Sequence, residues 1–160
     1  NIDDIIQIED QELIVNFLDI MENHKMLVEN SGLLTVAALK HLDCKNKKVV
    51  SILSGGNMDI ITLSSVVQHG LIQRGRVFTV SVQLPDRPGE LGKVANVIAE
   101  MKGNVIRLEH NQFVSINRNA AVELRITMEA FGQDHKKEII DRLKKEGYTP
   151  KEESPTGIYE

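Results

Sequence analysis

The stretch at residues 84–91, Leu-Pro-Asp-Arg-Pro-Gly-Glu-Leu, constrains the fold more than any other part of the chain. An alternating apolar run at 77–84 precedes it and predicts a strand, and helically spaced apolar residues follow it over 90–102. Because Pro85 and Pro88 fix φ and remove backbone donors, neither element can continue through the loop. The chain must turn here from a strand into a helix. The exposed amides of that helix start suit a small ligand's carboxylate, whereas an ordinary proline-stiffened turn would bind nothing.

Composition excludes several classes of function. The net charge of −4 provides no basic field for nucleic acid or an anionic membrane, and no apolar run is long enough to cross a membrane. The single cysteine, Cys44, rules out a disulfide framework and fits a reducing cytoplasm. The five histidines lack the spacing of metal ligands, so we expect no metal site. The chain has 160 residues and does not begin with Met, and we expect it to be a fragment of a longer protein.

After a boundary at residues 74–76, the pattern predicts a β-α-β-β-α-β order. The predicted elements are strand 77–84, helix 90–102, strand 104–116 with a bulge at its polar break, strand 120–130, helix 133–146 and strand 147–152, with a hairpin turn at 115–119. This order is typical of an α+β, ferredoxin-like fold in which two helices cover one face of the sheet. Strand 120–130 alternates apolar and polar residues, so one sheet face should be dry and the other wet.

The first 75 residues show a different pattern. We expect a short strand at 2–8, a helix capped by Asp10, a small-residue helix near 33–39, a buried strand at 48–53 and a helix at 60–73. The strand at 48–53 leads directly into Ser54-Gly55-Gly56-Asn57. Ligands of open α/β sheets lie beyond the carboxyl ends of strands, which makes this turn a candidate site. The alternative is that its glycines serve turn geometry only.

The element order and the loop at 86–91 resemble the ACT domain, a small regulatory module of amino-acid metabolism that pairs its sheets or sheet edges. The resemblance covers residues 76–153 and leaves 154–160 as a tail. It implies an amino-acid effector, with isoleucine and valine as candidates, and a homo-oligomer (a dimer or a tetramer) formed through ACT domains. The effector residues that it implies are Asp86, Arg87, Pro88, Gly89, Glu90, Leu91, Asn104, Val105 and Ile106.

Residues 1–75 resemble the end of the catalytic lobe of fold-type II pyridoxal-phosphate enzymes. The resemblance rests on Val28-Glu29-Asn30-Ser31-Gly32, the small-residue helix and the Ser54–Asn57 turn. A following ACT domain makes the threonine ammonia-lyases the most similar members. The family implies that Ser54 hydrogen-bonds the pyridine nitrogen of pyridoxal 5'-phosphate, with Gly55, Gly56 and Asn57 beside it. A hydroxyl there leaves the nitrogen largely neutral, which suits elimination of a β-hydroxyl better than transamination.

The family's Schiff-base lysine and its phosphate-binding glycine loop lie upstream of this ending. We therefore expect no catalytic residue and no activity in this fragment, whereas its parent would convert threonine to 2-oxobutanoate and ammonia in the cytoplasm. A biosynthetic and a catabolic role both stay open. The alternatives are a stand-alone ACT module that binds amino acids or dimerises, and the tail of a serine dehydratase or racemase. Because half a lobe cannot bury its sheet, we expect either poor order before about residue 75 or loss of that segment from any crystal.

Two further features leave alternatives open. His110, on the second predicted ACT strand, could contact a ligand or an opposite subunit, or could belong to a solvated polar break. Lys136, Lys137, Lys144 and Lys145 alternate with acids on the last helix. Such mixed charge predicts a solvated helix face.

Overall fold

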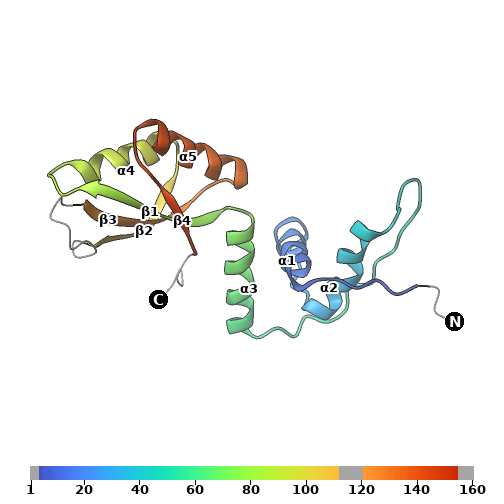
Figure 1. Cartoon of the computed structure of the whole chain (residues 1–160). Helices are drawn as coiled ribbons and strands as arrows, with labels where there is room; N and C mark the ends of the chain where they lie inside the picture. Colours follow the sequence, from blue (N-terminus) through green and yellow to red (C-terminus); the bar gives the residue numbers. More distant parts are fainter. Residues whose placement is uncertain (1–3, 112–120, 155–160) are drawn as a thin grey trace. The chain divides into compact units, whose positions relative to one another are not determined.

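A computed structural model describes residues 4–111 and 121–154 of the chain (Figure 1). The chain divides into two compact units, Asn1–Gly70 and Leu71–Glu160, so the division lies within helix α3 (Ile60–Gln73). The predicted boundary at 74–76 follows the end of this helix. Each unit is described by itself.

The second unit contains one four-stranded sheet and two helices. Its elements are β1 (Val77–Pro85), α4 (Glu90–Glu100), β2 (Asn104–Asn111), β3 (Ala121–Glu129), α5 (Gln133–Lys145) and β4 (Lys151–Glu153). The strand order is β2-β3-β1-β4, and all neighbouring strands are antiparallel. Both helices lie on one face of the sheet (Figure 1). This arrangement confirms the predicted ferredoxin-like βαββαβ fold.

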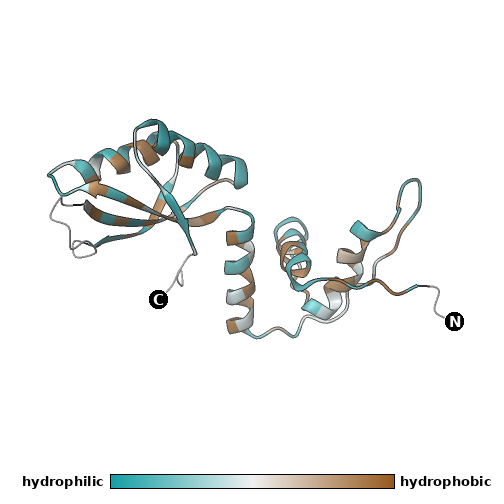
Figure 2. Cartoon of the chain, viewed as in Figure 1, coloured by the Kyte–Doolittle hydropathy of each residue, from teal (hydrophilic) through white to brown (hydrophobic). Residues whose placement is uncertain are grey.

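The alternation of side chains on β1 and β3 separates a dry sheet face from a wet one. The core lies between the sheet and the helices, and it contains Phe78, Val80, Val82, Leu84, Val94, Ile98, Leu124, Ile126, Met128, Ile139, Ile140 and Leu143. The outer side of α5 is hydrophilic (Figure 2). The other sheet face carries ion pairs, including Arg107 Nε to Glu109 Oε1 at 2.9 Å and Arg125 Nε to Glu153 Oε2 at 2.9 Å. The predicted dry face is therefore confirmed, whereas the opposite face is polar but partly buried.

One polar pair on the wet face is nevertheless buried. Thr79 of β1 and Thr127 of β3 are directly opposite in register, and their hydroxyl oxygens are 2.8 Å apart. Thr79 is 1% exposed and Thr127 is 7% exposed. Their hydroxyls satisfy each other, as buried polar groups must.

The start of the last strand and the position of the irregularity in β2 differ from the prediction. The last strand begins at Lys151 rather than at residue 147, because the amides of Gly147 and Tyr148 close the end of α5 by donating to Lys144 O and Leu143 O. The irregularity in β2 lies between Val105 and Arg107, whereas the register is regular at Glu109, His110 and Asn111, the described part of the predicted polar break. The predicted turn at 115–119 and the end of the predicted strand 104–116 lie outside the described residues.

The first unit is a packed group of helices. It contains α1 (Asp10–His24), α2 (Asn30–Ala37), a 3₁₀ turn at Ala38–His41 and most of α3. Its core consists of Leu13, Phe17, Leu18, Ile20, Val28, Leu33 and Ala37. The prediction of poor order is therefore wrong for the described residues of this unit. The predicted cap is also wrong, because Glu9 is the N-cap of α1 and Asp10 is its first residue.

Neither predicted strand of the first unit forms among its described residues. Residues 4–9 and 47–59 have no regular structure. The segment at 48–53 lies beside α2 and is held there by two hydrogen bonds. Thr35 Oγ1 donates to Ile52 O at 3.0 Å, and Ser51 Oγ donates to Thr35 O at 3.4 Å. A strand needs a neighbour for its backbone groups, and the described residues of this unit supply none. The segment consequently leaves Val50 88% exposed and Ile52 73% exposed.

Candidate functional site

The loop between β1 and α4 forms a hollow at one end of the sheet. The hollow has a volume of about 330 Å³, and it is lined by residues 84–91 and by His110 of β2. All six residues predicted from the loop, Asp86 to Leu91, therefore line one site. The amide of Arg87 donates to Pro85 O at 2.8 Å, which closes the turn. Gly89 has a φ of +92°, and a Cβ built on it would meet no atom within 4 Å, so the space above it is open.

The lining of this hollow carries both signs of charge. Asp86, Arg87 and Glu90 contribute the charges, and His110 contributes an imidazole ring. Lys93 Nζ lies 2.8 Å from Glu90 Oε1, and this hydrogen bond and the carboxylate's charge raise the pKa of Lys93. Glu90 is thus partly neutralised from within α4. The remaining acid, Asp86, together with Arg87 and the amides at the start of α4, suits a ligand that carries both a carboxylate and an ammonium group.

The other predicted effector residues lie elsewhere in the unit. Asn104 pairs with Glu129, which pairs with Val77 at the start of β1, whereas the loop follows Pro85 at its end. At about 3.3 Å per residue, the length of β1 separates the two ends by roughly 26 Å. Within one chain, Asn104, Val105 and Ile106 are therefore not brought to the loop. His110, near the other end of β2, lines the hollow instead.

In the first unit, the Ser54–Asn57 turn packs tightly against the start of α2. The amide of Glu29 donates to Gly55 O at 3.2 Å, and Ser31 Oγ donates to Glu29 Oε1 at 2.5 Å. A Cβ on Gly55, which has a φ of +80°, would lie 2.4 Å from Glu29 Oε1. A Cβ on Gly32 would lie 1.9 Å from Ser54 O. Both positions therefore require glycine.

A hollow of about 280 Å³ lies beside this turn. It is lined by Glu29, Asn30, Ser31, Asn57, Met58, Asp59 and Thr62. Of the four predicted cofactor residues, only Asn57 lines it, while the side chain of Ser54 is exposed. Asp59 lies just before α3, where its Oδ1 accepts the Thr62 amide at 2.9 Å and its Oδ2 accepts the Thr62 hydroxyl at 2.5 Å. These two hydrogen bonds lower the pKa of Asp59 below 3.8.

Two classes of site are not found in the described parts of the chain. Residues 4–111 and 121–154 contain no group of three or more His, Cys, Asp or Glu side chains that could hold a metal ion. No helix within these same ranges has both the length and the apolar character that a membrane span requires.

The ACT domain family matches residues 78–147, which extend from β1 past the end of α5. Residues 78–147 form an ACT domain.

Similarity to known proteins extends beyond the ACT domain into the first unit. The chain is 34% identical over 149 residues to the L-threonine ammonia-lyase of Geobacter sulfurreducens and 30% identical over 148 residues to that of Thermotoga maritima. It is 29% identical over 153 residues to the biosynthetic L-threonine dehydratase of Pasteurella multocida. Each match covers 92% of this chain, which spans only 37% of the length of the first two proteins and 28% of the third. These matches confirm the predicted resemblance to the threonine ammonia-lyases.

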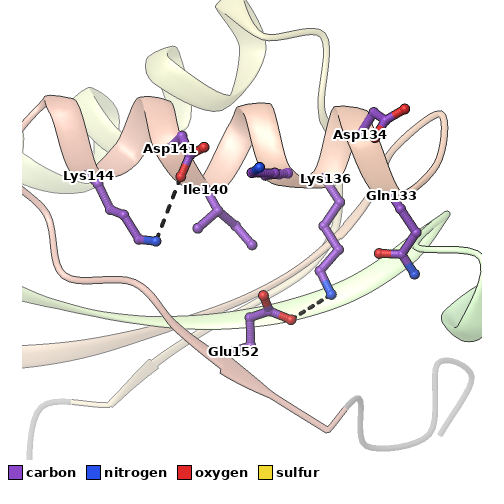
Figure 3. A pocket seen from close by; sticks show the side chains of 8 residues that line it. Gln133, Asp134, Lys136, Ile140, Asp141, Lys144 and Glu152 are labelled. Atoms are coloured by element: carbon purple, nitrogen blue, oxygen red, sulfur yellow. Dashed lines mark ion pairs between the residues drawn. The ribbon is translucent and has the colours of Figure 1, made fainter.

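A second hollow of the ACT domain lies between α5 and β4 (Figure 3). It has a volume of about 340 Å³ and is lined by Gln133, Asp134, Lys136, Lys137, Ile140, Asp141, Lys144 and Glu152. Lys136 Nζ lies 2.5 Å from Glu152 Oε2 and 5.6 Å from the centre of the Phe78 ring. Lys144 Nζ lies 3.7 Å from Asp141 Oδ1. Most of the charge in this hollow is therefore paired internally.

The pairing of Glu152 also affects the edge of the sheet. Glu152 is opposite Val80, a core residue of β1, so its carboxylate is on the helix-covered side of the edge strand β4. Charges that point inward on an edge strand hinder the addition of another strand. The other edge, β2, instead exposes Ile106 and Leu108, which are 37% and 40% exposed.

Proposed function

We propose that this chain is the regulatory C-terminal part of a pyridoxal-phosphate-dependent L-threonine ammonia-lyase, whose ACT domain binds an amino-acid effector. The observation that carries this proposal is the similarity to L-threonine ammonia-lyases over 92% of the chain, which includes both units. The whole protein would convert threonine to 2-oxobutanoate and ammonia. Isoleucine and valine are the effectors that we would test first.

The first unit would contribute one wall of the cofactor site. The close approach of Gly32 in α2 to Ser54 O holds the Ser54 backbone in place. A fixed backbone suits a residue whose hydroxyl must be positioned for a hydrogen bond. Ser54 would hydrogen-bond the pyridine nitrogen of pyridoxal 5'-phosphate, with Gly55, Gly56 and Asn57 beside the ring. The cofactor supplies an electron sink for elimination. The exposed Val50 and Ile52 would pair, as a strand, with the remainder of the catalytic lobe.

The ACT loop hollow would hold the effector. The amides at the start of α4 and Arg87 would bind its carboxylate, and Asp86 would bind its ammonium group. Leu84, Leu91 and the two prolines give the same hollow an apolar wall, which suits a branched aliphatic side chain. The proposed ligand is therefore a hydrophobic amino acid.

A second copy of the chain would complete this site. If two β2 edges pair antiparallel, the start of one strand lies beside the end of the other. Asn104, Val105 and Ile106 of the second copy would then approach the hollow next to His110. The exposed apolar side chains on β2 and the inward Glu152 on β4 both favour pairing through β2. Effector binding would regulate the enzyme through its different affinities for two subunit arrangements.

Calorimetric titration of the chain with isoleucine, valine, threonine and serine, together with sedimentation, tests the sensor role. We expect one of them to bind a dimer with micromolar affinity, and Arg87→Ala to weaken that binding. Lys145→Ala, which removes an exposed cation outside both ACT hollows, is the matched control. A folded dimer that binds none of the four would refute the sensor role and favour a pure dimerisation module.

The catalytic part of the proposal is tested on the whole protein. Purified with its cofactor, it should release ammonia and 2-oxobutanoate from L-threonine. A clear preference for L-serine would favour the alternative assignment as a serine dehydratase.

A further inference from the structure

His110 interrupts the apolar side of β2 at the point where this strand reaches the loop hollow. The helix-facing positions of β2 are identified by their partners in β3. Val105 pairs with the core residue Met128, Leu108 pairs with Ile126, and His110 pairs with Leu124. The first two positions are apolar, as the dry face requires, and the third is a histidine. An imidazole at this position needs a polar partner or solvent.

The partner is not supplied by the protein within the part of the chain that the structure describes. The side chain of His110 makes no hydrogen bond or ion pair with residues 4–111 or 121–154, and it is exposed and lines the hollow. The charged groups that share the hollow are Asp86, Arg87 and Glu90, all from the loop or α4. His110 is thus the only polar side chain on the sheet side of this hollow among the described residues.

The charges on the other walls indicate which ligand group would face His110. Glu90 is paired with Lys93, and Asp86 is the remaining acid for an ammonium group. The carboxylate needs several donors, and a histidine ring always carries at least one N–H. We infer that His110 donates a hydrogen bond to the effector's α-carboxylate from the sheet side and thereby makes the site select ligands with a free carboxylate. This inference rests on the proposed effector role of the loop hollow.

The test compares an amino acid with its amide, in which a neutral carboxamide replaces the carboxylate. L-isoleucine and L-isoleucinamide, or valine and valinamide if valine is the tighter ligand, are titrated into the wild-type chain and into His110→Leu, His110→Gln and His69→Leu. His69 is an exposed histidine of the first unit, so its variant controls for loss of a surface imidazole. Sedimentation and thermal melting check each variant for its oligomeric state and folding.

The expected result follows from the strength of a hydrogen bond to a charged group. His110→Leu should weaken isoleucine binding about tenfold to a hundredfold, while isoleucinamide binding changes less than about twofold. His110→Gln should recover most of the affinity, and His69→Leu should bind as the wild type does.

Three outcomes would overturn the inference. If His110→Leu weakens the binding of isoleucine and isoleucinamide equally, or changes neither affinity, His110 does not contact the carboxylate. Weaker binding accompanied by loss of the dimer would make His110 an assembly residue. A wild-type chain that binds no amino acid would remove the proposed effector function itself and this inference with it.

Discussion

The buried hydroxyl pair between β1 and β3 allows a sharp test of how the polar sheet face is stabilised. Thr79 and Thr127 are the perturbation sites, each changed to Val alone and then together. Their hydroxyl oxygens are 2.8 Å apart, and the two residues are 1% and 7% exposed. Each single variant leaves one buried hydroxyl without its partner, whereas the double variant leaves two apolar groups of similar shape.

The expected magnitudes follow from this asymmetry. A buried hydroxyl that loses its partner costs about 1–3 kcal/mol, whereas replacing both partners is nearly neutral. Each single variant should therefore lower the free energy of unfolding of the ACT unit by about 1–3 kcal/mol. The double variant should be more stable than either single variant. For a unit of this size, each kcal/mol corresponds to roughly 4–8 °C in melting temperature.

The assay is thermal and denaturant unfolding followed by circular dichroism, with amide exchange on β1 and β3 to localise the effect. Thr149→Val, at an exposed threonine of the same unit, is the control and should change stability little. If the double variant loses the sum of the two single losses, the hydroxyls do not satisfy each other and the reasoning is refuted.

Three other perturbations have definite expected outcomes. The hydrogen bonds from Thr62 lower the pKa of Asp59, so the stabilisation of α3 by this cap should be complete above about pH 3.8 and should disappear as the pH falls through the folded-state pKa. NMR titration of the Asp59 carboxyl group checks this prediction. A midpoint at the ordinary pKa of an aspartate would contradict it. Gly92→Ala, within α4 and with open space for a Cβ, should stabilise the ACT domain by about 0.5–1 kcal/mol, whereas Gly89→Ala should destabilise it because its φ is +92°; equal melting temperatures would refute this contrast. Gly32→Ala should displace the Ser54 turn, because the new Cβ would lie 1.9 Å from Ser54 O, and unchanged amide exchange near Gly55 would exclude this.

The ACT fold could be predicted from sequence because its signals are mostly local and its partners lie within the unit. The prolines around Asp86 forced a turn, and alternation on β1 and β3 specified a dry face that α4 and α5 cover. The start of β4 was predicted too early because the amides of Gly147 and Tyr148 bond to the last turn of α5. The pattern of apolar residues does not indicate these hydrogen bonds.

The first unit shows why an apolar pattern can predict a strand that does not form. Residues 48–53 have the composition of a buried strand, but the neighbours that complete a strand are often distant in sequence. Here Thr35 of α2 makes two hydrogen bonds with the segment, one to Ile52 O and one from Ser51 Oγ, and no strand ladder forms among the described residues. The helices nevertheless form, because Phe17, Leu18 and Leu33 bury their apolar faces against one another.

The candidate effector site was predictable in part. Asp86 to Leu91 line one hollow because they are consecutive in a single turn. Asn104 to Ile106 were assigned by resemblance, and only the strand register shows that they lie at the far end of the sheet. His110 carried a signal in the sequence, since it interrupts an apolar alternation, but its proximity to the loop depends on the register of β2 with β3.

In the proposed assembly, the Lys136–Glu152 pair would limit how many copies can join through this sheet. A protein sheet with two equally adhesive edges can add copies without end, as in fibrous aggregates. Here the β4 edge carries an inward carboxylate that is paired with Lys136 of α5, which would leave the β2 edge to pair with a second copy. When two β2 edges pair around a twofold axis, the backbone groups of each edge are hydrogen-bonded to the other, and no edge that can add a further strand is left. The ion pair would thereby convert an open-ended association into one that stops at two sheets.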